Sequence, residues 1–533
     1  MDTPQAERLG RAIVAMRPLQ IGALPLAYPI LDELQVQQTV STLVSSQADV
    51  DLGLVVVMLT LNRLLAPQPL YHVQDWLVGT ILPEFLGVAP RQAYDNRLGR
   101  ALDHLHPHLG EIWARVATRC IERYDIDLDI LHWDITSVCF EGAYADSELA
   151  TYGYSRDHRP DTKQANLQVD ATHDGQIPVL YEVLRGNTAD ITRPLPHLRA
   201  ILRFFARPEL ARRHLRPLLV SDRKLVTPEA VLACHRDNLQ YLAPLSDGTA
   251  TRALLSSVPA DELAQHVLAY RPQRIKPDDT RFVPYQGVWR SYTFVHKEKQ
   301  VTDRALVVWS AGKQRLDEQK RKTYLKRLLN ALEHIQKKLN RLRYKRRAYV
   351  EQRLASLQVS APAKELVDWQ LTGEEGALRL TFRINKERLA EARALDGRYA
   401  LATNADHLHA GEALALYKGQ DGLEKRFAVV KGPLLVHPLF VHSDRRIEGL
   451  IFISLLALLV RAVLERACHQ QGIKVTAQRL LEGFAALQAV DLTWADGSLQ
   501  RRAAEMTEFQ ATVLKALARP GPETYTRLTP IVR

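Results

Sequence analysis

The chain has 533 residues, 46% of them hydrophobic and 25% charged, which allows three or four domains with packed cores and excludes wholesale disorder. Its 71 Lys and Arg residues outnumber 60 Asp and Glu residues, and the net charge of +11 favours a polyanionic partner, either nucleic acid or an anionic membrane. Four widely spaced cysteines without CxxC spacing argue against a zinc site and a disulfide framework, and they fit a reducing cytoplasm.

The first 125 residues have the apolar spacing of helices. The segments "LPLAYPILDELQVQQTVSTLV" and "LGLVVVMLTLNRLLA" repeat apolar residues every three or four positions and are separated by polar turns. The pattern predicts a helical N-terminal domain over residues 1–125. Such a domain either binds DNA or serves in packing and dimerisation.

From residue 126 the period changes to that of strands. Five segments have this alternation, with helical segments between the later ones: 126–136, 166–172, 177–183, 216–222 and 239–245. Three meandering strands followed by alternating helices and strands is the order of an RNase H-like α/β core. We therefore predict that residues 126–245 form the first part of such a mixed-sheet core, in which the first and fourth strands are neighbours.

Residues 246–408 interrupt this core as a large insertion with β-rich pieces. Within it, residues 313–357 predict one long helix, because apolar residues from Leu328 to Leu342 follow the spacing of a coiled-coil seam. Between Lys320 and Arg347 there are twelve basic residues and a single acid, Glu333. The excess of positive charge favours contact with phosphates over a merely solvated helix face.

The core resumes at residues 409–470, and residues 471–533 predict a C-terminal helical region. The stretch "YKGQDGLEKRFAVVK" (417–431) predicts one helix that ends at Gly432-Pro433, with Tyr417, Gln420, Glu424 and Lys431 on one face. The longest apolar run, residues 450–460, is too short to cross a bilayer and indicates a buried helix. The N-terminus lacks the pattern of a signal peptide.

Two aspartates end strands that the fold order makes neighbours. Asp134 ends the first predicted strand, and Asp222 ends the fourth. Adjacent carboxylates repel each other, and Mg²⁺ relieves that repulsion while it also binds substrate phosphate oxygens. A third acid from a nearby helix, for which Glu424 is the candidate, would allow two ions to be held. Glu448 is the competing glutamate, but an acid there has a routine use in the first turn of an apolar helix.

Several of these segments together resemble the bacterial insertion-sequence DDE transposases that carry the Tyr-Arg-Glu-Lys (YREK) signature. Tyr417, Glu424 and Lys431 have the signature spacing, and Gln420 stands where Arg is usual. The segments "WDITSVCFEG" and "SDRKLVT" resemble the surroundings of the first and second catalytic Asp. Similarity extends to "GYSRDHRPDTKQANLQVDATHDGQIPVLYEVLRGNTAD", to "RRIEGLIFISLLALLVRAVLE", and to the N-terminal "LPLAYPILDEL" and "DNRLGRALDHL".

The resemblance implies a cytoplasmic enzyme that cleaves DNA at the ends of a mobile element and transfers the freed strand into target DNA. Asp134, Asp222 and Glu424 would hold two Mg²⁺ ions, with Mn²⁺ as a substitute, and a homodimer would bind the terminal inverted repeats. Tyr417, Gln420, Lys431 and Arg223 would contact DNA, and the glycines beside Gln420 would let DNA approach the helix closely. No membrane is implied.

Three residues depart from the family pattern. Lys224 replaces the usual Gly, Leu225 the usual aromatic residue, and Gln420 the usual Arg. Two alternatives therefore stay open, a catalytically silent DNA-binding protein derived from a transposase and a nuclease that cuts DNA without joining it.

Overall fold

The computed structural model describes residues 13–526 except 158, 214, 273, 274, 277, 359, 360, 435–440 and 442. The chain divides into two compact units. Unit 1 combines residues 1–222 with 419–533, and unit 2 comprises residues 223–418. Each unit is described by itself.

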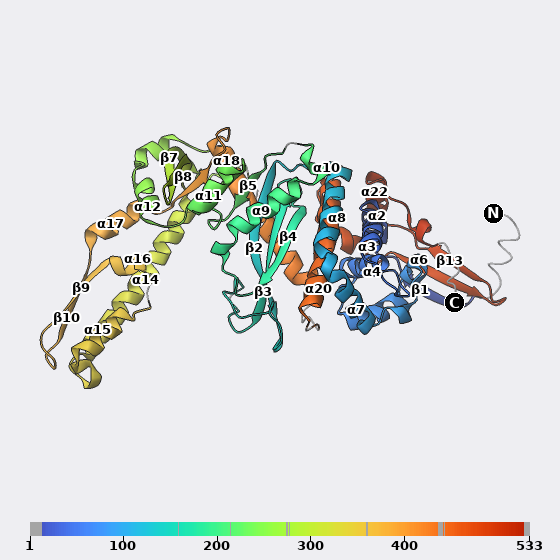
Figure 1. Cartoon of the computed structure of the whole chain (residues 1–533), viewed down its shortest axis with the longest axis horizontal. Helices are drawn as coiled ribbons and strands as arrows, with labels where there is room; N and C mark the ends of the chain where they lie inside the picture. The colour runs from blue at the N-terminus through green and yellow to red at the C-terminus, as the bar shows by residue number, and fades with distance from the viewer. Residues whose placement is uncertain are drawn as a thin grey trace. The chain divides into compact units, whose positions relative to one another are not determined.

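Unit 1 contains four strands of a mixed sheet, in the order β4-β3-β2-β5 (Figure 1). Their bounds are β2 (Ile130–Phe140), β3 (Lys163–Thr172), β4 (Pro178–Arg185) and β5 (Leu218–Ser221). The strands β2, β3 and β4 form an antiparallel meander, whereas β5 runs parallel to β2. The prediction that the first and fourth strands of this region are neighbours is therefore confirmed.

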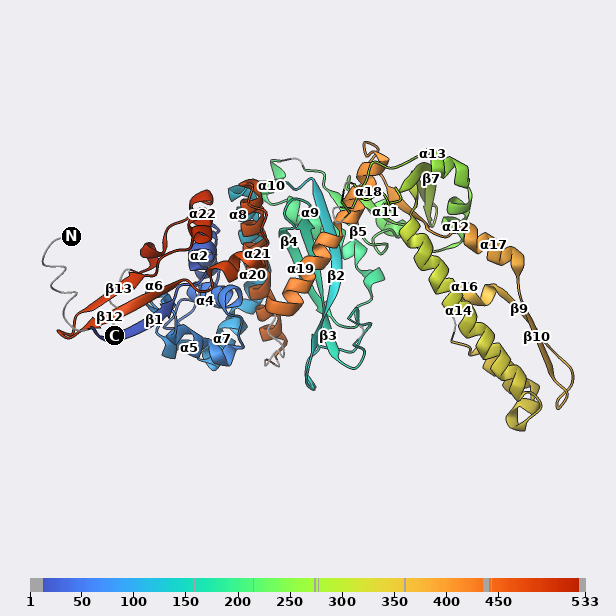
Figure 2. The ribbon, with the colours of Figure 1, turned by 180° about the vertical axis from the view of Figure 1, so that it is seen from behind.

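One long apolar helix, α20 (Asp444–Gln470), organises the rest of unit 1. It lies between the sheet and the N-terminal helices in both views, and it contacts β4, α2 (Leu24–Glu33), α4 (Leu52–Leu65) and α7 (Asp95–Leu105) (Figures 1 and 2). Among the described residues it is the one helix long and apolar enough to cross a bilayer, and 94% of its most apolar window is buried inside the protein. A bent pair, α4 with residues 70–78, passes the same test only if it is counted as one span. The burial of α20 is that of a core helix.

The two ends of the chain belong to the same compact unit. Strand β1 (Ile13–Gln20) pairs antiparallel with β12 (Gln488–Trp494), which pairs with β13 (Leu499–Ala503). The expected boundaries after residues 125 and 470 are thus not boundaries between compact units, and neither end is wholly helical. The physical reason is α20, whose apolar surface on all sides has to be enclosed by the sheet and by the N-terminal helices together.

Unit 1 contains further short and long helices. They are α3 (Val36–Leu43), η1 (Leu70–His72), α5 (Val73–Val78), α6 (Leu82–Leu86), η2 (Pro90–Gln92), η3 (His106–His108), α8 (Leu109–Arg123), η4 (Asp190–Thr192), α9 (Pro194–Phe205), α10 (Pro208–Ala211), α19 (Asp421–Val429), η6 (Val430–Leu434), α21 (Ala477–Phe484), α22 (Glu508–Ala516) and η7 (Pro522–Tyr525).

Unit 2 has strands in the order β6-β11-β8-β7, each antiparallel to the next. They are β6 (Gln240–Pro244), β7 (Gln286–His296), β8 (Lys299–Trp309) and β11 (Arg398–Thr403). The hairpin β7–β8 confirms the predicted β-rich piece of the insertion. The helices of this unit are α11 (Pro228–Arg236), α12 (Thr249–Ser256), α13 (Ala260–Gln265), α17 (Lys386–Ala394) and α18 (Ala410–Gly419), whose last residue belongs to unit 1.

The middle of unit 2 is an arm of helices and a β-hairpin, residues 311–384 (Figures 1 and 2). Its elements are α14 (Ala311–Lys338), η5 (Leu342–Lys345), α15 (Arg347–Ala355), α16 (Ala361–Glu365), β9 (Val367–Thr372) and β10 (Arg379–Ile384). The prediction of one helix over residues 313–357 is wrong, because α14 ends at Lys338 and the chain turns back. The apolar seam of Leu328, Leu332 and Ile335 is buried against α15 and the β9–β10 hairpin, so the chain covers the seam itself.

Candidate active site

The two predicted catalytic aspartates occupy matching positions on neighbouring strands. In the parallel pairing of β2 with β5 the last partners are Trp133 and Ser221, and Asp134 and Asp222 are the next residue on each strand. Asp134 does not end β2, which continues against β3 to Phe140, but it stands where the pairing with β5 stops. Because neighbouring strands lie about 4.8 Å apart, the two acids are side by side along the backbone.

The carboxylates of these aspartates are half-buried and already have interactions within the fold. Both side chains have intermediate exposure, and Asp134 accepts a hydrogen bond of 2.7 Å from the backbone N–H of Ile135. Both aspartates have polar or electrostatic interactions with the protein. Glu424 on α19 is exposed.

The structure does not gather a complete metal site. Among the described residues, no three His, Cys, Asp or Glu side chains lie close enough together to hold a metal ion. The donor chemistry nevertheless fits, because aligned carboxylates are the oxygen ligands that Mg²⁺ prefers. The assignment of Asp134, Asp222 and Glu424 as metal ligands stays a prediction.

Gln420, just before α19, fixes that helix to β2 from inside the fold. Its side chain is buried, and its Nε2 donates a hydrogen bond of 2.8 Å to the backbone carbonyl of Trp133. Since a carbonyl only accepts, the amide oxygen must face His132, whose Nδ1 lies 3.1 Å away and therefore carries the proton. Nε2 of His132 is then the acceptor for Nδ1–H of His173, at 2.9 Å. We call this chain of His173, His132 and Gln420 the Gln420 chain.

The Gln420 chain requires a neutral His132. Burial is the main cause that lowers the pKa of His132 to about 4, and the neighbouring His173 lowers it further. Because side chains alternate along a strand, His132 and Asp134 lie on the same face of β2, the face that α19 covers. The Gln420 chain thus connects the helix that carries Glu424 to the strand that carries Asp134 (Figure 2).

The glycines beside Gln420 have a packing role. A Cβ on Gly419 would lie 3.2 Å from the His173 ring and 3.3 Å from the His132 ring. A Cβ on Gly422 would lie 2.8 Å from the side chain of Gln176. The space in the Cβ direction of both glycines is therefore filled by the protein itself. The interpretation that they let DNA approach the helix stays a prediction.

The predicted helix over residues 417–431 is divided into three pieces. The helix α18 ends at Gly419, α19 runs from Asp421 to Val429, and Lys431 lies in the π-helical turn η6. The first break is slight, because Gln420 keeps right-handed helical angles of φ −53° and ψ −31°. Arg426 anchors α19 further, since it donates 2.9 Å to the carbonyl of Gly175 and pairs with Glu465 of α20 at 3.1 Å.

The residues expected to contact DNA have different surroundings. Lys431 pairs with Asp157 at 2.5 Å. Tyr417 belongs to unit 2, where the ammonium of Lys418 lies 5.5 Å from its ring and 5.6 Å from the ring of Tyr399. Gln420 is committed to the Gln420 chain, which leaves its predicted contact with DNA untested.

The segment after Asp222 belongs to unit 2. Arg223 is exposed, and its guanidinium lies 3.7 Å from the carboxylate of Asp247. Lys224 has an interaction within the protein. Leu225, which departs from the family pattern, is 1% exposed and fills the core of the unit.

Glu448, the competing glutamate, is engaged elsewhere in unit 1. Its carboxylate lies 3.3 Å from Nε2 of His106, at the junction of α20 with the N-terminal helices. This pairing favours Glu424 as the third acid.

The opposite face of β2 holds a second polar cluster that sequence reasoning missed. The ring of Trp133 stacks on His197 of α9 with centroids 4.2 Å apart, and Nε2 of His197 lies 3.2 Å from the buried Asp170 carboxylate. Burial raises the pKa of Asp170. By strand alternation this cluster points away from Asp134, so we assign it a role in packing α9 on the sheet. The period-2 pattern of β2 would also have placed His132 beside Asp134 from the sequence alone.

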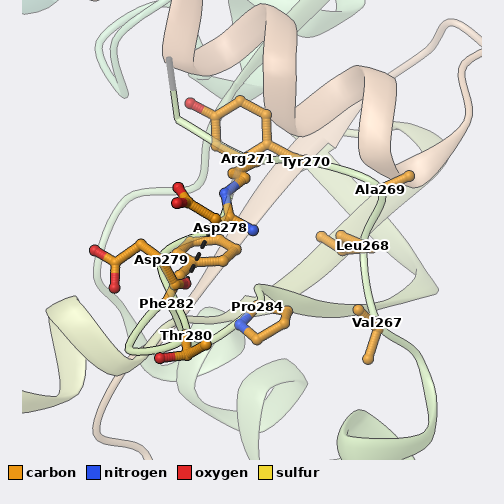
Figure 3. Close-up of a pocket in the computed structure, with 10 residues that line it drawn as sticks. All are labelled: Val267, Leu268, Ala269, Tyr270, Arg271, Asp278, Asp279, Thr280, Phe282 and Pro284. Carbon is orange, nitrogen blue, oxygen red and sulfur yellow. Dashed lines mark hydrogen bonds between the residues drawn. The ribbon is translucent and has the colours of Figure 1, made fainter. Parts of the chain in front are cut away.

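A separate hollow of about 690 Å³ in unit 2 contains none of the predicted site residues (Figure 3). Arg271 stacks on Phe282 at 4.7 Å and donates hydrogen bonds to the carbonyls of Lys276 and Asp279. The guanidinium of Arg271 is therefore occupied by contacts with the protein itself.

Comparison with known proteins gives a family match and weak similarity to solved structures, two of which are described below. The family described as "Domain of unknown function (DUF4277)" matches residues 17–116. No curated protein matches the sequence. A cryo-EM structure of the piggyBac transposase synaptic complex with hairpin DNA aligns at a TM-score of 0.37 and 8% identity, covering 87% of this chain and 78% of that one. The Mos1 transposase paired-end complex aligns at a TM-score of 0.16 and 18% identity, covering 34% of this chain and 56% of that one.

Proposed function

We propose that this protein is a DDE transposase with an RNase H-like catalytic core. The observation that carries the proposal is the parallel pairing of β2 with β5, which sets Asp134 and Asp222 at matching positions. The strand order β4-β3-β2-β5 is the order expected of such a core. The signature spacing of Tyr417, Glu424 and Lys431 supports the proposal independently of the fold.

In this proposal Asp134, Asp222 and Glu424 hold divalent metal, with Mg²⁺ as the natural ion. The bound metal supplies activation of the attacking oxygen and stabilisation of the leaving oxygen. The protein itself positions the acids. The Gln420 chain holds α19 against β2, and Arg426 holds it against α20. The reaction is cleavage at the element end, followed by attack of the freed 3′-OH on target DNA.

Double-stranded DNA is the proposed partner, with Lys431 and Arg223 as proposed contacts. The arm of unit 2 adds a second basic surface, because most of the basic residues between Lys320 and Arg347 are exposed. We propose that this surface binds phosphates of the element end. A homodimer and a cytoplasmic location are parts of the same proposal.

The test is DNA cleavage by the full chain with Mg²⁺, on a plasmid that carries the inverted repeats flanking the gene. We expect wild type to cleave, and Asp134→Asn and Asp222→Asn to bind this DNA without cleaving it. Asp75→Asn is the matched control, because that side chain is 78% exposed in the N-terminal region and cleavage should persist.

The outcomes separate the alternatives. Binding without cleavage by wild type would support the catalytically silent protein, and cleavage without joined products would support the nuclease. Cleavage that survives both Asp→Asn changes would overturn the site.

A further inference from the structure

The turn at the end of the arm presents a leucine outward. Leu342 is 89% exposed, the highest exposure among the large exposed hydrophobic residues of the described chain. Its φ of 48° is in the left-handed region, which costs free energy for a branched side chain. A soluble protein gains nothing in its own core from this arrangement, so the residue requires another explanation.

The turn is built to hold that conformation. Asn340 also has a positive φ, and its side chain both donates to the carbonyl of Leu378 at 2.9 Å and accepts from the N–H of Leu378 at 2.8 Å. Gln336 donates 2.7 Å to the carbonyl of Leu380. The ring of Tyr344 packs on the arm's buried core and makes an edge contact with Tyr349. The arm's own residues therefore fix the turn and leave Leu342 outside.

The surroundings of Leu342 are strongly basic. The segment from 337 to 347 contains seven basic residues and no acid: Lys337, Lys338, Arg341, Arg343, Lys345, Arg346 and Arg347. The side chains of Arg341 and Arg343, on either side of the leucine, are exposed. Among the described residues their guanidinium groups form no hydrogen bond or ion pair, although the backbones of both take part in the turn. Two exposed guanidinium groups that flank one apolar side chain match a duplex, which offers phosphates on both sides of a base step.

We propose that Leu342 is a wedge that inserts between stacked base pairs and bends the DNA held by the arm. Apolar side chains used in this way partly unstack one step, and the bent duplex then reaches more of the protein surface. Arg341 and Arg343 bind the phosphates on either side of that step. The wedge rests on the proposed function only in that DNA is the partner of the arm.

An anionic membrane is the competing partner for a basic, partly apolar tip. Membrane binding strength scales with the apolar area that is buried. A single leucine on a turn offers little such area, and η5 presents no second large exposed hydrophobic residue. The observations therefore favour DNA.

The experiment measures DNA distortion by the full chain, separately from cleavage. The probes are end-labelled duplexes for energy transfer and duplexes with 2-aminopurine at a flexible pyrimidine–purine step. We expect wild type to shorten the end-to-end distance and to raise 2-aminopurine fluorescence. Leu342→Ser should remove most of both signals at saturating protein and weaken binding only a few-fold. Arg341→Ala with Arg343→Ala should instead lower the salt dependence of binding by about two phosphate contacts.

The matched control is Leu316→Ser. Leu316 is 55% exposed and lies near the start of α14, at the other end of that helix from the turn with Leu342. This variant should leave distortion unchanged. Wild-type distortion that survives Leu342→Ser, or binding without distortion, would overturn the wedge. Binding of vesicles of phosphatidylserine and phosphatidylcholine that depends on Leu342, without DNA distortion, would assign the tip to a membrane. Because distortion is read without cleavage, its loss leaves the tests of Asp134 and Asp222 intact.

Discussion

The two longest helices, α20 and α14, differ in length by one residue and have opposite surroundings. The helix α20 has 27 residues and is buried along most of its length, whereas α14 has 28 residues of which three are buried. The apolar helix brings the N-terminal helices and the sheet into one compact unit. The charged helix supports a basic arm and presents its tip. Helix length alone therefore does not indicate what a helix does in this protein. The distribution of charged and apolar residues along the helix does indicate it.

The largest expected effect separates two glutamates, one on α19 and one on α20. Glu424→Gln keeps the size of the side chain but weakens metal binding, so we expect it to lower Mg²⁺-dependent cleavage by on the order of a thousandfold or more while DNA binding persists. Glu448→Gln should leave cleavage largely intact, because Glu448 pairs with His106. Cleavage and DNA binding are measured for both variants on the same DNA. The reverse pattern would show that α20, and not α19, supplies the third acid.

The second prediction tests burial in the two helices directly. Phe452 on α20 is fully buried, so Phe452→Ala should lower the free energy of unfolding by about 3–5 kcal/mol. Leu316→Ala on α14 should change it by about 0.5 kcal/mol or less, because the side chain is largely exposed. Urea unfolding of the full chain, followed by circular dichroism, measures both. Equal losses in the two variants would contradict the assignment of α20 as the core helix.

The sequence predicted the strands of residues 126–245 well, but it missed β1, β12 and β13 in the two end regions that it predicted as helical. Strand alternation located β2 to β6 and the neighbouring positions of Asp134 and Asp222, because the period of two depends only on which side chains face the core. The apolar seam of α14 was predicted only in part, because Leu328, Leu332 and Ile335 are buried whereas Leu342, assigned to the same seam, is exposed on a turn beyond the end of the helix. A coiled-coil spacing does not reveal that the partner is the chain's own hairpin.

The neighbouring strand positions of Asp134 and Asp222 were predicted, whereas the contacts that hold α19 against β2 were missed. Gln420 stands at the signature position where Arg is usual and was assigned to DNA, but a signature does not show which way a side chain points. His132 and His173 are far from Gln420 in the sequence, and only the fold brings the three together. The candidate acids were visible in the sequence because two follow strand segments and the third has the signature spacing. The Gln420 chain, in contrast, depends on how α19 packs on β2.

The third prediction concerns the pH dependence of unit 1 near α19. His132 has a pKa of about 4 in the fold and about 6.5 when unfolded, so the unfolded chain binds more protons between these values. The contribution of His132 to the free energy of unfolding is therefore fully present above about pH 6.5 and is lost as the pH falls towards 4. The total loss is about 3 kcal/mol. The groups facing His132 are His173 from the β3–β4 connection and Gln420 from the start of α19. Urea unfolding at several pH values should show this slope in wild type and a flatter one in His132→Gln. An unchanged slope would exclude His132 as its source.

The smallest expected effect belongs to the basic surface of the arm. Neutralising Lys337, Lys338, Arg341 and Arg343 together should weaken DNA binding by about tenfold across sequences and reduce the slope of log affinity against log salt by up to about 3–4. Both effects follow because each phosphate contact releases counterions from the DNA, so binding with fewer contacts releases fewer of them. The control makes the same change in net charge on exposed residues of unit 1: Arg91, Lys474, Arg502 and Lys515. Affinity measured over a range of salt should fall much less in that control. Equal losses in both variants would mean that net charge, and not the arm, attracts the DNA, and would remove the functional contrast between α14 and α20.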